Sequence, residues 1–218
     1  MKRSHRVYDV VKRVLDVIAS AVLLVLLSPL LLALALLVRV NVGSPILFNQ
    51  KRPGRNGRLF TIRKLRTMKP VASVEGDVEA VSTDAERLTP FGRFMRSTSL
   101  DELPEFWNVL VGDMSIVGPR PLLTEYLDRY TPEQARRHEV RPGITGWAQV
   151  NGRNAIDWPE RFALDVWYVD HRSLLLDARI VGMTIGTALK RTGISSSGHA
   201  TMEPFDPDQP ARPSEEEP

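Results

Sequence analysis

The sequence predicts a mainly helical α+β protein with an amino-terminal membrane helix and one folded domain behind it. Three observations lead to this expectation. Residues 17–38 form an uncharged apolar run, short apolar runs alternate with turn signals over residues 41–68, and amphipathic segments follow over residues 161–190. An apolar run of that length is typical of a membrane helix, whereas the mixture of short strands and amphipathic helices is typical of an α+β domain.

The composition is that of one compact domain with appendages, because the chain has 218 residues, of which 43% are hydrophobic and 25% charged. The net charge of +3 suits an anionic membrane surface, phosphate substrates or nucleic acid. There are no cysteines, which excludes disulfides, thiolate nucleophiles and cysteine-based zinc sites. The four histidines show no pair at ligand spacing, so we expect them to be ordinary surface or structural residues.

The apolar run is long enough to cross a hydrocarbon core, since it would reach roughly 33 Å as a straight helix against about 30 Å. It is too long for the apolar region of a signal peptide. Ser28 and Pro29 lie at its middle. Pro29 removes a backbone donor and clashes with the carbonyl group of Val25, so the helix should kink there, and Ser28 can bond back to the preceding turn.

Both flanks of the run are basic, with Lys2, Arg3, Arg6, Lys12 and Arg13 before it and Arg39, Lys51, Arg52, Arg55 and Arg58 after it. The positive-inside rule places each flank in the cytoplasm. A helix that enters the bilayer, breaks at Ser28-Pro29 and returns to the same face satisfies both flanks. A kinked single span is the alternative.

Downstream of the run, Leu59 to Leu65 is a strand candidate that follows the turn signal Asn56-Gly57. Residues 70–88 are acidic and aperiodic, and we expect a mobile loop there. Thr131 followed by Pro132 predicts the start of a helix with Thr131 as its cap. The stretch is therefore expected to contain both strands and helices.

Two amphipathic segments near the carboxyl terminus carry an aromatic stripe over residues 158–168 and an apolar face over residues 174–189. Such helices lie in a membrane interface or pack on a domain core, and the sequence leaves both open. Beyond Gly193 the chain is rich in Ser, Pro and Glu, which predicts a disordered tail. We therefore divide the chain into a membrane segment over 1–40, a folded domain over 41–193 and a tail over 194–218.

An adjacent acidic pair, Asp101 and Glu102, stands out as the candidate catalytic centre. Neighbours on a helix point about 100° apart, so one carboxylate could attack while the other holds a metal ion. A structural alternative is a capping box with Ser99 as the cap. Pro104 weakens that alternative because it favours a helix that begins near itself. Either way the pair lies near a helix amino terminus, which attracts phosphate.

Two further clusters have the character of anion sites. Arg120 stands between two prolines, which stiffen its backbone and place its guanidinium well for a phosphate. Residues 141–153 combine glycines with hydrogen-bond donors, a pattern that suits either close approach to an anion or a structural turn. The sequence contains neither a Walker loop nor a dinucleotide-binding glycine motif, so a phosphate site here must be built from arginines and lysines.

These stretches together resemble the monotopic phosphoglycosyl transferases, the bacterial sugar transferase family. The matching motifs occur in family order behind an apolar helix broken at Ser-Pro, and the resemblance covers roughly residues 12–191 in the minimal form of the family. They are Lys64-Leu65-Arg66-Thr67-Met68, Thr98-Ser99-Leu100-Asp101-Glu102-Leu103-Pro104, residues 112–121 and residues 141–153.

The resemblance implies a re-entrant membrane helix and a catalytic domain on the cytoplasmic face of the bacterial inner membrane. It implies that Asp101 attacks a UDP-sugar, releases UMP and holds the sugar phosphate until polyprenyl (undecaprenyl) phosphate takes it. Glu102 would bind Mg²⁺, with Mn²⁺ as a substitute. The phosphate contacts would come from Lys64, Arg96, Arg120 and Arg153.

Two other functions remain open on the sequence alone. One is a membrane-anchored hydrolase of nucleotide-sugars or lipid phosphates that uses the same acidic pair. The other is a non-enzymatic scaffold of a polysaccharide export complex. Nucleic acid is not expected as a partner, because the basic residues cluster beside the apolar run, where anionic lipid explains them. The sequence does not identify the sugar, and it leaves a homo-oligomer open.

Overall fold

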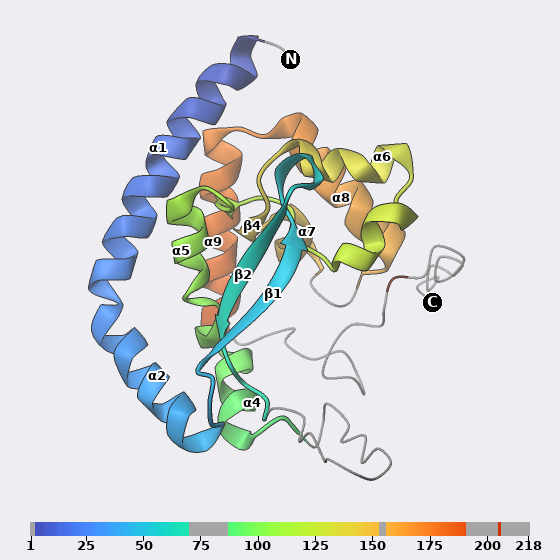
Figure 1. Ribbon diagram of the computed structural model, residues 1–218. Coiled ribbons are helices and arrows are strands. Elements are labelled where there is room, and N and C mark those ends of the chain that lie inside the picture. The colour runs from blue at the N-terminus through green and yellow to red at the C-terminus, as the bar shows by residue number, and fades with distance from the viewer. Residues whose placement is uncertain (1–2, 70–86, 153–155, 191–204, 206–218) are drawn as a thin grey trace, which may run out of the picture.

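The computed structural model describes residues 3–69, 87–152, 156–190 and 205 and has the mainly helical α+β architecture that the sequence predicts (Figure 1). The helices are α1 Arg3–Leu26, α2 Ser28–Asn41, α4 Pro90–Ser97, α5 Glu105–Val111, α6 Pro132–Ala135, α7 Trp147–Asn151, α8 Trp158–His171 and α9 Leu174–Lys190. The strands are β1 Leu47–Pro53, β2 Leu59–Leu65, β3 Ser115–Val117 and β4 Gly143–Thr145, and the 3-10 turns are η1 Arg55–Gly57, η2 Leu100–Glu102, η3 Thr124–Arg129 and η4 Arg136–Glu139.

The long amino-terminal helix breaks where the sequence predicts it. Helix α1 ends at Leu26, and α2 begins at Ser28 with Pro29 in its first turn. Ser28 Oγ donates to the carbonyl oxygen of Val25 at 2.7 Å, which satisfies an acceptor of the interrupted helix. No single described helix is long and apolar enough to cross a membrane, but Arg6–Leu26 and Ser28–Asn41 together meet those criteria with a bend of 62°.

Helices α1 and α2 both pack on the rest of the chain. Leu34, Val38 and Val42 are buried with Leu65 of β2 and Met95 of α4. Helix α1 runs along α5 (Figure 1). Its outward face is nevertheless apolar and exposed, as are much of α2 and the break: Val7, Val10, Val11, Val14, Leu15, Ile18, Val22, Val25, Leu26, Leu30, Leu32, Leu36, Leu37 and Val40.

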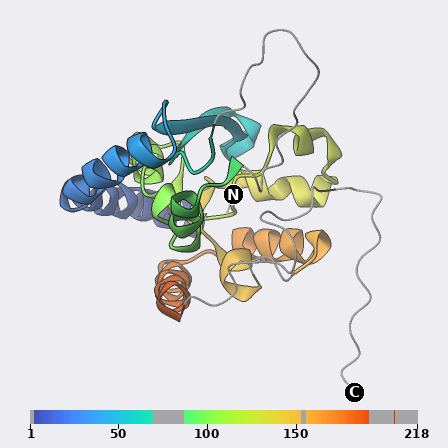
Figure 2. The same cartoon turned by 90° about the horizontal axis from the view of Figure 1, so that it is seen from below.

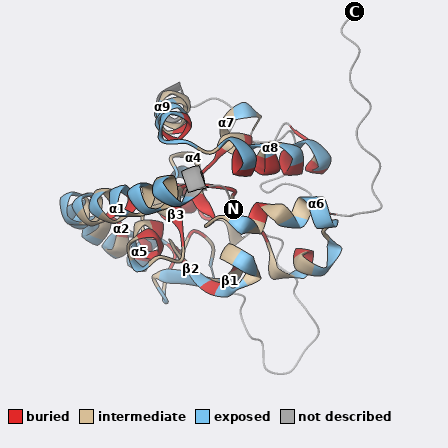
Figure 3. Cartoon of the chain, turned by 90° about the horizontal axis from the view of Figure 1, so that it is seen from above, coloured by how far each residue is buried: buried red, intermediate tan, exposed pale blue. Residues whose placement is uncertain are grey.

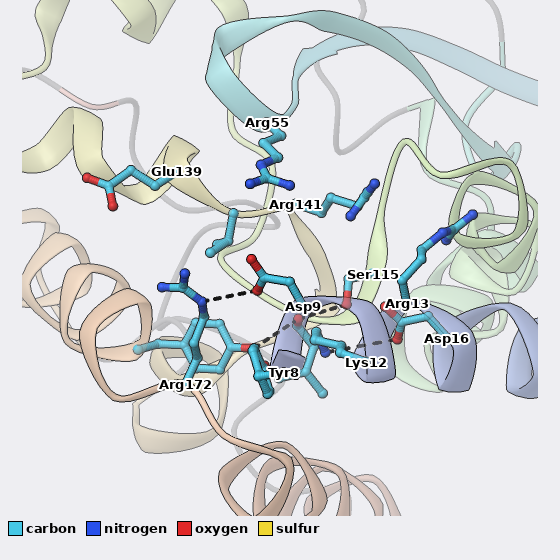
Figure 4. Close-up of a pocket in the computed structure, with 13 residues that line it drawn as sticks. Tyr8, Asp9, Lys12, Arg13, Asp16, Arg55, Ser115, Glu139, Arg141 and Arg172 are labelled. Carbon is cyan, nitrogen blue, oxygen red and sulfur yellow. Dashed lines mark hydrogen bonds and ion pairs between the residues drawn. The ribbon is translucent and has the colours of Figure 1, made fainter. Parts of the chain in front are cut away.

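The inner face of α1 is polar and hydrogen-bonded to the domain around a small pocket (Figure 4). Lys12 Nζ and Tyr8 Oη each donate to Asp177 Oδ2 of α9 at 2.8 Å. Arg13 donates to the carbonyl oxygens of Val109 and Leu110 at 2.6 and 2.9 Å, capping the last turn of α5. Two of the basic residues ahead of the apolar run are therefore bound to protein groups.

The strands form two small sheets of two strands each. Strands β1 and β2 are an antiparallel hairpin that pairs Leu47 with Leu65 and Pro53 with Leu59. The turn uses the positive φ angles of Asn56 and Gly57, as the Asn-Gly signal predicts. Strands β3 and β4 are a short parallel pair. The hairpin and the α8–α9 pair lie on opposite sides of β3 and α5 (Figures 2 and 3).

The aromatic stripe of α8 packs on the domain core, which was one of the two arrangements left open. Trp158, Phe162 and Tyr168 are buried, whereas Trp167 points outward and stacks on Trp147 of α7. Helix α9 has a mixed character, since Ile180 is fully buried and Leu175 is 82% exposed.

Several local predictions have definite outcomes. The strand over Leu59–Leu65 and the Thr131 cap of α6, with a complete capping box, are confirmed. The loop over residues 70–88 lies almost wholly outside the described residues, and the tail over 194–218 lies outside them apart from Phe205. Phe205 is only 4% exposed, so at this residue the tail is packed on the domain.

Candidate active site

The acidic pair lies on a one-turn 3-10 helix immediately ahead of α5. Ser99 adopts a left-handed conformation with φ of 56° and makes no side-chain cap, so the capping box is not formed. Pro104 instead occupies the N-cap position of α5, so this helix begins near Pro104, as expected from the proline. The sharp turn buries Asp101 to 8% exposure and points its neighbour toward β2.

Two cations from distant parts of the chain meet on Glu102. Lys64 Nζ of β2 donates to Glu102 Oε1 at 2.6 Å, and Arg120 Nη2 donates to the same oxygen at 2.5 Å. Lys64 Nζ also lies 3.1 Å from Glu105 Oε1, at the start of α5. Three of the residues predicted from sequence are thus in direct contact, and Glu105 is an additional carboxylate that sequence reasoning missed.

The carboxylates of this cluster have divergent acidities. Burial alone would raise the pKa of Glu102, but Arg120 and Lys64 outweigh it and hold that pKa well below its usual range. Burial and the neighbouring Glu102 charge raise the pKa of Asp101 to about 6. The same two causes raise the pKa of Glu105 to about 7. Glu102 is therefore always ionised, and Asp101 is mostly ionised at neutral pH.

Arg96 lies near the acidic pair but is not one of the partners of Glu102. Its Nε donates to Thr67 Oγ1 at 3.0 Å, and its positive charge favours the ionised form of Asp101. Its guanidinium is thus tied to the Lys64–Met68 motif. Arg153, the fourth predicted phosphate contact, lies outside the described residues.

The position of Lys64 relative to the acidic residues is fixed by a buried asparagine. Asn108 of α5 is fully buried, donates to the carbonyl oxygen of Thr61 at 2.8 Å, and accepts from the backbone N–H of Arg63 at 3.2 Å. These bonds use the outward-facing backbone groups of β2 and lock α5 against it. Lys64 and Glu105 therefore face each other in one register.

Arg120 is held in place by a buried ion pair. Arg137 Nη2 donates to the carbonyl oxygen of Arg120 at 2.8 Å and to Asp165 Oδ2 at 2.7 Å. Arg137 and Asp165 are each only 2% exposed. They are separated by 28 residues and belong to no recognisable motif, so sequence reasoning did not find this support.

The glycines of the third motif pack backbone against backbone. A Cβ on Gly143 would lie 2.1 Å from the backbone nitrogen of Gly118, and one on Gly146 would lie 2.2 Å from the carbonyl oxygen of Gly118. Of the two interpretations left open for residues 141–153, the structure therefore supports the structural turn at these glycines. Their close approach fixes the loop that carries Arg120.

Few side chains of the described residues could serve as ligands of a metal ion. Within the described ranges, no group of three or more His, Asp or Glu side chains is arranged to hold one. Mg²⁺ usually binds through one or two carboxylates and completes its shell with substrate phosphates and water. Glu102 is permanently ionised, and only its Oε1 accepts the hydrogen bonds described above. The donor set thus fits an Mg²⁺ ion that shares its ligands with a phosphate substrate.

Known proteins resemble this chain over most of its length. The family model described as bacterial sugar transferase matches residues 7–191. The chain is 50% identical over 196 residues to the uncharacterized sugar transferase EpsL of Bacillus subtilis, covering 90% of this chain and 96% of that protein.

Other relatives carry named activities. The UDP-glucose:undecaprenyl-phosphate glucose-1-phosphate transferase of Caulobacter vibrioides is 45% identical over 83% of this chain and 70% of its own length. The undecaprenyl-phosphate galactose phosphotransferase of Salmonella typhimurium is 38% identical over 88% of this chain, which spans only 42% of that protein.

Proposed function

Because the chain belongs to the bacterial sugar transferase family, we propose that it transfers a sugar-1-phosphate from a UDP-sugar to polyprenyl phosphate. The observation that carries the proposal is the contact of Lys64 and Arg120 with Glu102, the residue next to Asp101. Transfer of a phosphoryl group needs positioned cations beside an in-line nucleophile, and this cluster supplies both. The product would be the first intermediate of a lipid-linked glycan.

Asp101 is the proposed nucleophile. Its carboxylate oxygen would bond to the β-phosphorus of the UDP-sugar while the bond from that phosphorus to the bridging oxygen breaks. UMP then leaves with the bridging oxygen, and the sugar phosphate stays on Asp101 as an acyl phosphate. An oxygen of polyprenyl phosphate then attacks the same phosphorus and releases the Asp101 carboxylate. Its pKa of about 6 leaves Asp101 ionised at neutral pH without making it a poor leaving group.

Lys64 and Arg120 would stabilise the phosphate charge in both steps, and Arg96 is proposed to do so from its position beside Asp101. Without substrate the first two cations neutralise Glu102. A diphosphate entering the site would take over some of their hydrogen bonds, because its oxygens are charged acceptors of the same kind. Arg153 is proposed as a further contact on the strength of its motif.

Glu102 is the proposed metal ligand. Mg²⁺ bound there would neutralise charge on the phosphate oxygens and help to orient them, and Mn²⁺ would substitute for it. Glu102 suits this role because its neighbours keep it ionised throughout the physiological pH range. Glu105 would remain with Lys64 and hold that side chain in the site.

The chain is proposed to act at the bacterial inner membrane with the catalytic domain on the cytoplasmic face. The exposed apolar side chains of α1 and α2 form one extended face, and a large contiguous apolar surface supports burial in lipid. The first half of α1 is bonded to α9 and α5, and α2 leads directly into β1. Both ends of the bent pair thus lie at the same domain, which supports a re-entrant helix.

A screen for UMP release tests the function. The purified chain is incubated with a panel of UDP-sugars, a short polyprenyl phosphate and Mg²⁺. We expect UMP and a polyprenyl-diphosphate-sugar from one donor of the panel and no turnover in excess chelator. The named relatives use different sugars, so the donor has to be found by experiment.

The products also separate the alternatives. Free sugar phosphate formed without lipid product would indicate a hydrolase. A chain that supports glycan synthesis in cells after the change Asp101→Asn would be a scaffold, since a scaffold does not need that carboxylate. Either result would overturn the proposed transfer.

A further inference from the structure

Phe205, from the carboxyl-terminal segment, is buried in an aromatic pocket of the catalytic domain. Its ring centroid lies 5.0 Å from that of Phe162, 5.5 Å from those of Tyr126 and Trp158, and 6.1 Å from that of Tyr130. With an exposure of 4%, it is a member of this cluster as fully as the residues of α8. Aromatic contacts of this kind contribute beyond the area they bury.

The backbone of Phe205 is fixed as well as its side chain. Its N–H donates to Tyr126 Oη at 3.0 Å, and its carbonyl oxygen accepts from Arg129 Nη1 at 3.1 Å. Both partners belong to η3, about 80 residues earlier in the chain. A residue held on both sides of its backbone and packed on four rings occupies a specific site.

This pocket adjoins the ion pair that holds Arg120. The guanidinium of Arg137 lies 5.8 Å from the ring centroid of Tyr130 and 5.6 Å from that of Phe162. Arg137 Nη1 also lies 3.3 Å from Tyr130 Oη. Tyr130 and Phe162, two of the rings that contact Phe205, thus also pack against the guanidinium of Arg137. The aromatic rings that include Phe205 therefore help to bury the Arg137–Asp165 pair, whose two residues are each 2% exposed.

We propose that Phe205 is a positioning residue that fixes Arg120 through the aromatic cluster and Arg137. The contacts run from Phe205 to Tyr130 and Phe162, then to Arg137, to the carbonyl oxygen of Arg120, and by the Arg120 guanidinium to Glu102. Removing the Phe205 ring opens a cavity on one side of Tyr130 and admits water to the ion pair. Arg120 then loses its fixed position over Glu102, although no catalytic group has been changed.

This inference rests on the proposed transferase function for its activity readout. Full-length Phe205→Ala should lower kcat for UMP release by about tenfold to a hundredfold, the effect of misplacing a catalytic group by a fraction of an ångström or more. Phe205→Leu, which refills much of the pocket, should recover most of the rate. Leu59→Ala, at an exposed residue of the hairpin, is the control and should leave the rate unchanged.

A double-mutant cycle separates positioning from general destabilisation. Arg137→Lys keeps the charge but removes the forked guanidinium that bonds Arg120 and Asp165 together. If Phe205 acts through Arg137, Phe205→Ala should cost much less in the Arg137→Lys background than in the wild type. Equal costs in the two backgrounds, a wild-type rate in Phe205→Ala, or a loss of rate that only matches the loss of folded protein would each overturn the proposal.

Hydrogen exchange provides a readout that needs no enzymatic activity. In Phe205→Ala, amide exchange should accelerate over residues 118–123 and 136–140 but not over the β1–β2 hairpin. Unchanged exchange in the first two segments would also overturn the proposal. If the wild-type chain releases no UMP from any donor while this exchange pattern is observed, the proposed function fails and the structural link from Phe205 to the Arg120 loop stands.

Discussion

At the scale of single residues, three neighbouring carboxylates of the site have different pKa values because their surroundings differ. Glu102 accepts from two cations and stays ionised, whereas burial shifts the pKa values of Asp101 and Glu105 upward. Environment rather than residue type therefore assigns the roles. The sequence motif identified the first two residues because they are adjacent. Glu105 is recognised as part of the site only because Lys64 Nζ lies 3.1 Å from its Oε1, and Lys64 is 41 positions earlier in the chain.

A half-buried histidine, His138, gives the molecule a pH-dependent stability. Burial and then the charge of Arg137 lower the pKa of His138 to about 4, and its Nε2 is buried without a hydrogen-bond partner. In the unfolded chain His138 binds a proton near pH 6.5, whereas in the folded chain it does so only near pH 4. The contribution of neutral His138 to the free energy of unfolding is therefore complete above pH 6.5 and is lost as the pH falls from 6.5 to 4.

We predict that protonation of His138 lowers the free energy of unfolding of the wild type by at most about 3 kcal/mol as the pH falls. The variant His138→Gln should not show this part of the decrease. The measurement is chemical denaturation of the wild type and the variant between about pH 4 and pH 7.5. His171→Gln, at an exposed histidine, is the matched control and should retain the loss. A His138→Gln curve parallel to that of the wild type would refute the assignment.

At the scale of secondary-structure elements, the sequence predicted helix breaks, turns and caps correctly where the conformation of the local backbone determines them. Pro29 breaks the helix, Asn56-Gly57 closes the hairpin, and Thr131 caps α6, because each acts on its nearest neighbours. Elements whose placement depends on distant partners were left open. The aromatic face of α8 is a core face because residues distant in sequence meet it, among them Tyr126 of η3 and Phe205.

The bent helix pair leads to a prediction about topology. The chain has no native cysteine, so a Ser4→Cys variant reports the position of the amino terminus by labelling with an impermeant thiol reagent. Intact cells should protect Cys at position 4, since Lys12 and Arg13 tie this half of α1 to the catalytic domain. Adding Pro29→Ala, which restores a backbone donor, should increase the labelled fraction by favouring a straight helix.

A Glu133→Cys variant is the control, because this exposed residue of α6 lies on the catalytic domain. It should be labelled only after the cells are permeabilised. Labelling of position 4 from outside in the variant that retains Pro29 would refute the re-entrant arrangement and favour a kinked single span.

At the scale of the whole molecule, the fold joins residues from distant segments of the chain around one cluster. Strand β2 supplies Lys64, η2 supplies the acidic pair, and the loop after β3 supplies Arg120. Asn108 and the Arg137–Asp165 pair hold these segments in register. The motifs predicted residues that the structure brings into contact, namely Lys64, Glu102 and Arg120. They could not predict the supports, which are single buried residues with long-range partners and no local pattern.

The same scale explains where the membrane would lie. The polar inner face of α1 holds the domain, and its apolar outer face is exposed, where the proposed contact with lipid would form. Helix α2 shares a core with β2 and α4, the elements that carry Lys64 and Arg96. With α1 and α2 in the bilayer as proposed, a lipid-embedded acceptor would approach a site that is packed directly on these helices.

The central claim is that Asp101 carries the sugar phosphate covalently, and single-turnover chemistry tests it most directly. Enzyme mixed with the UDP-sugar donor but no polyprenyl phosphate should release at most about one UMP per active site in a burst. Intact-protein mass spectrometry should then show the added mass of one sugar phosphate, which disappears when lipid is supplied and never forms in Asp101→Asn. Normal turnover with lipid, but neither burst nor adduct without it, would contradict the account and leave Asp101 as a general base.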